Sequence, residues 1–173
     1  RALYRASVYG NLGIMFPMIT SVSEVQKVLE ICKTVREELQ AEQIPYAEKM
    51  ELGIMIETPA AAIISDQLAP LVDFFSVGTN DLTQYTLACD RQNPDIESFC
   101  DTHHEAILRL IAWSAKNAHE HGAWIGICGE LAADTFLTER FLRMGIDELS
   151  VSPTFVLKVR DAVRKVDLRT KEN

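Results

Sequence analysis

Short apolar runs alternate with longer helical patterns along most of this sequence, and this alternation constrains the fold more than any other feature. Between the runs, apolar side chains recur at helical spacing, as in the segment that begins with the capping box of Ser21 and Glu24. Runs this short and apolar are typical of strands buried on both faces. Strands that alternate with helices predict a parallel sheet built from right-handed βαβ units. The runs are Gly13–Ile19, Leu52–Ile56, Asp73–Val77, Trp124–Cys128 and Glu148–Val151.

Two architectures are compatible with such a sheet: an open doubly wound sheet and a (β/α)8 barrel. No GxGxxG motif follows any of the runs, so nothing in the sequence indicates a dinucleotide-binding fold. A complete barrel typically needs about 250 residues, whereas this chain has 173. We therefore predict an α/β fold of the parallel (β/α)8 barrel type. Residues 1–173 are expected to form a single partial domain that holds roughly the last five βα units.

The start of the chain supports this prediction. The first residue is Arg rather than Met, and residues 1–9 have a helical pattern with no cap before it. Leu3, Ala6 and Val8 are expected on the buried side of this helix, and Gly10 is expected to end it in a left-handed conformation. We interpret the chain as part of a longer polypeptide.

The acidic balance of the chain argues against one broad class of function. The sequence has 17 Lys and Arg against 25 Asp and Glu, a net charge of −8, whereas general nucleic-acid binding needs a basic surface. No apolar run approaches the ~20 residues of a membrane-spanning helix, so no membrane insertion is expected. Cys32, Cys89, Cys100 and Cys128 form no CxxC pair. We predict that all four are free thiols of a cytoplasmic protein.

The residues at the ends of the predicted strands are the candidates for chemistry, because the carboxyl ends of parallel strands share one mouth. Glu57 follows the second run, Asn80 and Asp81 follow the third, and Cys128 ends the fourth. Two carboxylates after two adjacent strands are suited to Mg²⁺, which takes few protein ligands. The alternative for Glu57 and Asp81 is that they cap the helix and the turn that follow them.

Two further candidates also have ordinary structural explanations. Cys128 is either an inert buried side chain or a thiol that faces the mouth and holds a proton for transfer. Arg91 is either a surface partner of the preceding Asp90 or a bidentate ligand for a carboxylate or phosphate. The residues alone leave both alternatives open.

Six stretches in a fixed order make the sequence specific enough to indicate a family. The sequence resembles the phosphoenolpyruvate-utilising enzymes, and within them the barrel that binds phosphoenolpyruvate (PEP) in the enzyme I group of the bacterial PEP:sugar phosphotransferase system. The stretches are spread over nearly the whole chain: Ile14–Ile19, Gly53–Ala61, Phe75–Tyr85, Asp90–Arg91, Cys128–Ala132 and Glu148–Ser152.

The resemblance implies a phosphotransferase with a (β/α)8 barrel at whose mouth PEP binds through Mg²⁺, for which Mn²⁺ can substitute. It implies that Glu57 and Asp81 are the metal ligands, that Asn80 and Arg91 bind the substrate, and that Cys128 is the catalytic acid. Cys128 protonates C3 of the enolate as pyruvate forms. The implied phosphoryl acceptor is a histidine on a separate N-terminal domain, which passes the group to the carrier HPr in the first step of sugar uptake. The resemblance also implies a homodimer formed through the barrel.

Pyruvate phosphate dikinase and PEP synthase are the nearest alternative within the same superfamily. They share the sequence contexts of Glu57, of Asn80 and Asp81, and of Cys128. The run Thr83–Asn93 and the ending Glu148–Ser152 look more like the enzyme I group.

Two other classes of function also need to be considered. A carbon–carbon lyase of the same barrel lineage holds a pyruvate enolate on Mg²⁺ but has no evident need for an acid at Cys128. A non-catalytic dimerisation fragment is the other possibility, with Phe99, Trp113 and Phe155 as candidate interface residues. We expect core packing for at least two of these three aromatic side chains.

Overall fold

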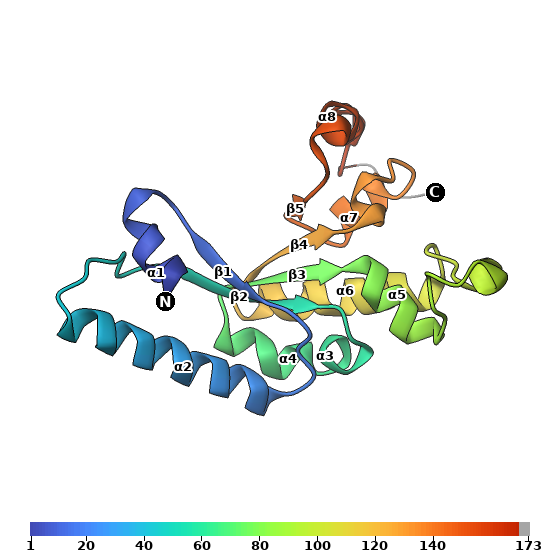
Figure 1. The fold of residues 1–173 in the computed structure, drawn as a ribbon. Coiled ribbons are helices and arrows are strands. Elements are labelled where there is room, and N and C mark those ends of the chain that lie inside the picture. Colours follow the sequence, from blue (N-terminus) through green and yellow to red (C-terminus); the bar gives the residue numbers. More distant parts are fainter. Residues whose placement is uncertain (170–173) are drawn as a thin grey trace.

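The computed structural model describes residues 1–169, and its centre is a five-stranded parallel sheet. The strands stand side by side in chain order (Figure 1), and each predicted run overlaps one of them, with ends that differ by one residue at β2 and β3. The predicted parallel α/β fold is therefore confirmed, and among the described residues the sheet is open. The strands are β1 (Gly13–Phe16), β2 (Glu51–Ile56), β3 (Phe74–Gly78), β4 (Trp124–Cys128) and β5 (Glu148–Leu149).

Helices connect the successive strands. Figure 1 shows α2, α3, α4 and α6 along one face of the sheet, while no helix of the described residues covers the other face of β1 to β3. The α-helices are α1 (Ala2–Ala6), α2 (Val22–Ala41), α3 (Pro59–Ile63), α4 (Ser65–Leu68), α5 (Thr79–Leu87), α6 (Glu105–Glu120), α7 (Thr138–Arg143) and α8 (Val156–Lys165). The short 3₁₀ helices are η1 (Ser7–Tyr9), η2 (Ala69–Leu71), η3 (Pro94–Phe99), η4 (Glu130–Ala133) and η5 (Pro153–Phe155).

The two faces of the sheet differ in burial. Alternate strand residues pack into the core with the helices: Ile14, Ile54, Ile56, Phe75, Val77, Ile125 and Ile127. On the other face, Met15 is 41% exposed, and the rings of Phe74 and Trp124 stack with their centroids 4.5 Å apart. The expectation that every strand is buried on both faces is wrong for β1 in residues 1–169, because the helices cover one face only.

Side chains cap the first turns of α2 and α3; the sequence predicts the cap of α2, whereas at α3 the cap is Thr58 and not Glu57. The Ser21 Oγ atom accepts from the Glu24 N–H group, and the Glu24 carboxylate accepts from the Ser21 N–H group, so the capping box of α2 is confirmed. At α3, Thr58 Oγ1 accepts from the Ala61 N–H group and donates to the Ile19 carbonyl oxygen at 2.7 Å. This second bond ties the loop after β1 to the end of β2.

The first helix is shorter than predicted and buries a different side. Tyr4 and Ser7 are the buried residues, whereas Leu3 and Val8 are exposed. Tyr4 packs with Cys32 of α2, and burial together with this neighbour raises the pKa of Tyr4 to about 12. Gly10 is extended, with φ of 167°, so the predicted left-handed helix end is wrong. The local apolar pattern misses this arrangement because contacts with α2, far along the chain, select the buried side.

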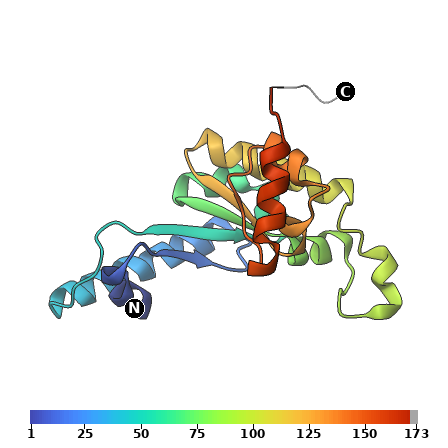
Figure 2. The same cartoon turned by 90° about the horizontal axis from the view of Figure 1, so that it is seen from above.

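The three aromatic residues that we considered for an interface are all exposed. The exposed fraction is 71% for Phe99, 44% for Trp113 and 40% for Phe155. The expectation that at least two of them pack into the core is therefore wrong. Phe99 belongs to the segment of residues 88–101, which projects from the molecule at the end opposite α1 (Figure 2). No helix among residues 1–169 combines the length and the apolar character needed to span a membrane.

Candidate active site

Glu57 lies directly after β2 and is only 3% exposed. Its Oε1 atom accepts a hydrogen bond from the Met18 N–H group at 2.7 Å. Met18 has a φ of 57°, which is the left-handed region that side-chain-bearing residues rarely adopt. The sharp turn of the loop after β1 therefore points the Met18 N–H group toward Glu57, and this hydrogen bond fixes the carboxylate at the end of the sheet.

The neighbouring strand leaves room for this carboxylate. A Cβ atom at Gly78 would lie 2.9 Å from both Cβ and Oε2 of Glu57. Real Cβ atoms do not approach other atoms this closely, so any larger residue at the end of β3 would displace Glu57. Gly78 thus allows a buried carboxylate to lie across the end of the adjacent strand.

Asn80 connects the end of β3 to the loop after β4. Its Oδ1 atom accepts from the Glu130 N–H group at 3.1 Å, and the hydroxyl of the adjacent Thr79 donates to the Cys128 carbonyl oxygen at 2.9 Å. Gly129, at φ of 95°, lies so close that a Cβ atom there would be 2.6 Å from Thr79 Oγ1. The ends of β3 and β4 are consequently held in one rigid arrangement.

Cys128 ends β4 with a half-buried, free thiol. The Ser76 hydroxyl donates to its Sγ atom at 3.4 Å, and the thiol donates to the Val77 carbonyl oxygen, also at 3.4 Å. Ser76 and Cys128 share the sheet face that the helices leave uncovered, because Gly78 pairs with Cys128 in the β3–β4 register. The thiol is therefore partly accessible and has a hydroxyl donor at its sulfur.

Asp81 and Arg91 form an ion pair. Asp81 lies in the first turn of α5, and its Oδ1 atom is 3.6 Å from Arg91 Nη2. Both side chains are more than one third exposed, so this pair contributes little to stability. Arg91 is therefore paired with the predicted site residue Asp81 of α5, whereas Asp90, the alternative partner considered from the sequence, accepts from the Gln92 N–H group.

Two cavities open at the carboxyl ends of the strands, and Asn80 and Glu130 line both. One, of about 450 Å³, is also bounded by Ser150 and Ser152. The other, of about 490 Å³, is also bounded by Gln84 and Arg91. The structure therefore brings Asn80 and Arg91 to a common cavity.

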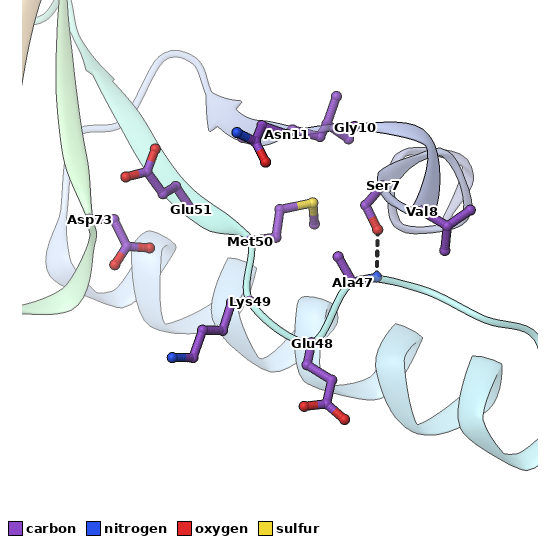
Figure 3. A pocket seen from close by; sticks show the side chains of 12 residues that line it. Ser7, Val8, Gly10, Asn11, Ala47, Glu48, Lys49, Met50, Glu51 and Asp73 are labelled. Atoms are coloured by element: carbon purple, nitrogen blue, oxygen red, sulfur yellow. Dashed lines mark hydrogen bonds between the residues drawn. The ribbon is translucent and has the colours of Figure 1, made fainter.

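A larger cavity of about 920 Å³ lies at the amino end of the sheet. Gly13, Glu51 and Asp73 line it, and Figure 3 shows Glu51 and Asp73 at its wall. Its wall is tied together by the hydrogen bond from the Ala47 N–H group to the Ser7 hydroxyl. Ligand sites of parallel α/β folds lie at the carboxyl ends of the strands. We therefore assign the anion-binding part of the candidate site to the two smaller cavities, which Glu57, Asp81 and Cys128 do not line.

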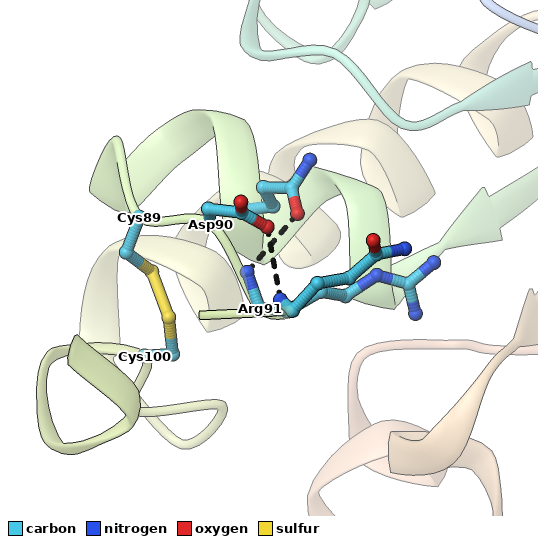
Figure 4. The surroundings of a disulfide bond; sticks show 6 residues. Cys89, Asp90, Arg91 and Cys100 are labelled. Carbon is cyan, nitrogen blue, oxygen red and sulfur yellow. Dashed lines mark hydrogen bonds between the residues drawn. A yellow bond between two sulfur atoms is a disulfide. The ribbon is translucent and has the colours of Figure 1, made fainter. Parts of the chain in front are cut away.

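The loop that carries Arg91 is closed by a disulfide between Cys89 and Cys100 (Figure 4). The prediction that all four cysteines are free is wrong for this pair and right for Cys32 and Cys128. The physical reason is that the loop folds back and brings the two Cα atoms to 6.0 Å, a normal separation for a disulfide. The spacing of the cysteines in the sequence does not indicate this return.

The donor set at the strand ends is compatible with a hard cation. Glu57 and Asp81 offer carboxylate oxygens, and Glu57 Oε2 faces the space that a side chain at residue 78 would fill. Oxygen ligands of this kind suit Mg²⁺ and Mn²⁺. Residues 1–169 contain no group of three or more His, Cys, Asp or Glu arranged for a metal.

The sequence interpretation missed three groups that shape the site. Ser76 could have been found from the two-residue period of β3, which places it on the same face as Cys128. Glu130 follows Cys128 by two residues, but only the structure shows that its N–H group binds Asn80. The Met18 contact has no sequence signal, because it depends on an unusual backbone conformation.

Solved structures with the same fold include two enzymes of low sequence identity. A citrate lyase from Burkholderia xenovorans superposes with a TM-score of 0.69 at 19% identity, over 92% of this chain and 51% of that chain. The malate synthase of Haloferax volcanii superposes with a TM-score of 0.63 at 15% identity, over 93% of this chain and 46% of that chain. At these identities the likeness concerns the fold alone.

Curated relatives are much more similar in sequence. The phosphoenolpyruvate-protein phosphotransferase of Priestia megaterium is 47% identical over 166 residues, which is 96% of this chain and 29% of that protein. The protein of the same name from Lactococcus lactis subsp. cremoris is 47% identical over 99% of this chain and 30% of its own length. The chain thus spans less than one third of either relative. The family model described as the PEP-binding domain of PEP-utilising enzymes matches residues 1–168. The chain therefore belongs to the PEP-utilising enzymes.

Proposed function

We propose that the protein containing this chain is a PEP-protein phosphotransferase of the enzyme I type, which moves the phosphoryl group of PEP to a histidine and releases pyruvate. The observation that carries this proposal is the position of Glu57, Asn80 and Cys128 at the carboxyl ends of three adjacent parallel strands. It is supported by the 47% identity to two proteins that bear this name.

The metal ligands in this proposal are Glu57 and Asp81. Glu57 is held in place by the Met18 N–H group, and Asp81 becomes available when Arg91 turns from it to the substrate. A bound Mg²⁺ supplies positive charge that stabilises the phosphoryl oxygens as they separate from the enolate oxygen.

The substrate anion is bound by Asn80 and Arg91. Asn80 lies in the first turn of α5, where backbone N–H groups have no partner within the helix and attract anions. The guanidinium group of Arg91 binds a carboxylate or phosphate with two parallel hydrogen bonds. Both residues line the same cavity of about 490 Å³, so one anionic ligand can contact both.

The proton needed to complete pyruvate comes from Cys128. When the bond between phosphorus and the enolate oxygen breaks, the phosphoryl group passes to the histidine and the electron pair stays on the enolate. C3 of the enolate then takes the proton of the Cys128 thiol. The Ser76 hydroxyl already donates to the sulfur, so it stabilises the thiolate that remains.

The remaining parts of the reaction are assigned outside this chain. We place the acceptor histidine on another domain of the protein, since the chain covers 29% to 30% of the two relatives. From that domain the phosphoryl group passes to HPr as the entry step of sugar uptake. The proposal includes a cytoplasmic homodimer, as the family resemblance implies.

The proposal is tested by incubating the full-length protein with Mg²⁺ and PEP that carries a labelled phosphoryl group. The expected result is one acid-labile phosphohistidine, an equal amount of pyruvate, and transfer of the label to HPr without any nucleotide. The alternative dikinase or synthase activity predicts instead that PEP forms from pyruvate and ATP. No labelled histidine and no pyruvate would refute the proposed function.

A further inference from the structure

The disulfide between Cys89 and Cys100 lies outside the residues assigned to catalysis, yet it closes the loop that carries Arg91. Cys89 follows the end of α5 by two residues and is buried, at 4% exposure. Cys100 is half-buried and lines the cavity that Asn80 and Arg91 share. The bond therefore joins the end of α5 to the wall of the proposed anion site. Figure 4 shows the disulfide beside Asp90 and Arg91.

The other bonds of this loop are few and local. The Cys89 and Arg91 N–H groups bind the Gln84 carbonyl and side-chain oxygens, respectively. The hydrogen bonds described for the N–H groups of residues 92–96 stay within the loop. Most of these residues are exposed. The disulfide is thus the covalent contact that restricts how far the loop can move from α5.

We propose that Cys89 and Cys100 form a reversible modification site, at which thiol–disulfide exchange sets the affinity of the anion site through Arg91. The inference rests on the proposed function, because it takes the anion bound by Arg91 to be PEP. A disulfide across a separation of 11 residues removes many open conformations of the loop. In the oxidised protein the loop is held close to α5 and Arg91 stays at the wall of the anion cavity, whereas in the reduced protein PEP must order the loop when it binds, which weakens its affinity.

The exposure of the two sulfur positions predicts the order of the chemistry. The thiolate of the more accessible Cys100 attacks a small external disulfide such as oxidised glutathione, which forms a mixed disulfide and releases one external thiol. The Cys89 thiolate then attacks the Cys100 sulfur, forms the internal bond and releases the second external thiol. The two cysteines lose two electrons and two protons, and the external disulfide gains both. A dithiol reductant reverses the sequence.

The test compares the full-length protein in oxidised and reduced glutathione buffers. Reduction is expected to raise KM for PEP by about 3- to 10-fold and to change kcat by less than about twofold, because ordering of the loop affects binding before chemistry. Cys89→Ser and Cys100→Ser are expected to show the high KM in both buffers. Cys32→Ala removes a buried free thiol far from the loop and is the matched control, with normal redox dependence.

Two measurements separate a failure of this inference from a failure of the proposed function. Cys89→Ser is expected to trap glutathione on Cys100, and hydrogen exchange of residues 90–99 is expected to be slower in the oxidised protein. Both are measured without PEP. Turnover with the same KM in both buffers, or equal exchange in both, overturns the redox site. Absence of turnover in both buffers refutes the proposed function, and the trapping and exchange results then decide the redox site alone.

Discussion

Replacing Cys128 with Ala is expected to lower kcat of PEP-dependent phosphorylation by about 10²- to 10⁴-fold, the usual contribution of a positioned general acid. Binding of the anion is assigned to Asn80 and Arg91, whereas Cys128 acts on C3 only after the phosphoryl group has left. PEP affinity is therefore expected to stay within about threefold of the wild-type value. Steady-state kinetics of pyruvate release by the full-length protein gives both quantities.

A more specific measurement follows the proton itself. In D₂O the phosphorylated wild-type protein is expected to exchange the methyl protons of pyruvate with solvent, because in the proposed mechanism the Cys128 thiolate removes a proton from C3. NMR of pyruvate is expected to show no such exchange with Cys128→Ala, and little with Cys128→Ser, since a hydroxyl is a much weaker acid than a thiol. Cys32→Ala is the control and retains the exchange. Wild-type exchange in Cys128→Ala would exclude Cys128 as the acid.

The same variant distinguishes a phosphotransferase from a carbon–carbon lyase. The likeness to a citrate lyase at 19% identity concerns the fold alone, so a functional test has to separate the two chemistries. A lyase of this lineage has no evident need for a thiol acid, so Cys128→Ala would leave its turnover unchanged.

Replacing Gly78 with Ala is the second change with a large expected effect. The added Cβ atom would lie 2.9 Å from Cβ and Oε2 of Glu57 and 2.9 Å from the Met55 Cε atom. The Met55 methyl group can move, but Glu57 is held by the Met18 N–H group and has little space. We expect a loss of about 1–3 kcal/mol in the free energy of unfolding, as for other overpacked sites. Divalent-cation affinity should fall by at least about tenfold, because Glu57 is displaced.

The control for this variant is Gly13→Ala. Gly13 is also a strand glycine, and by register it lies on the same face of the sheet as Gly78. Its added Cβ atom meets its nearest neighbours at 3.5 Å, which is ordinary contact. Urea unfolding and Mn²⁺ titration of both variants should therefore separate Gly78 from Gly13. Equal behaviour of the two variants would show that the close approach to Glu57 has no role.

The positions of the candidate site residues could be predicted from the sequence because they follow strands. Parallel strands place their carboxyl ends at one edge, so finding the apolar runs was enough to place Glu57, Asn80 and Cys128 at the same edge of the sheet. Their roles do not follow from position alone. The contacts that hold them, such as the Met18 N–H group on Glu57, arise from loop conformations that leave no pattern in the sequence.

The errors concern contacts between distant segments. The helix at the start of the chain buries Tyr4 rather than Leu3, because its environment is set by α2 and not by its own apolar spacing. Cys89 and Cys100 meet because the chain reverses between them, and an interval of 11 residues gives no sign of that reversal. The last predicted strand shortens to the two residues of β5, since Pro153 begins a short helix soon after it.

The most direct test of the account is Mn²⁺ binding to the full-length protein with and without PEP, followed by water-proton relaxation. Mn²⁺ takes the same oxygen ligands as Mg²⁺ and is visible in this measurement. The account predicts that PEP tightens Mn²⁺ binding in the wild-type protein, and that Glu57→Gln and Asp81→Asn abolish this effect while Glu51→Gln, at the opposite end of β2, retains it. Mn²⁺ binding that PEP does not alter, or that survives both ligand substitutions, would contradict the account.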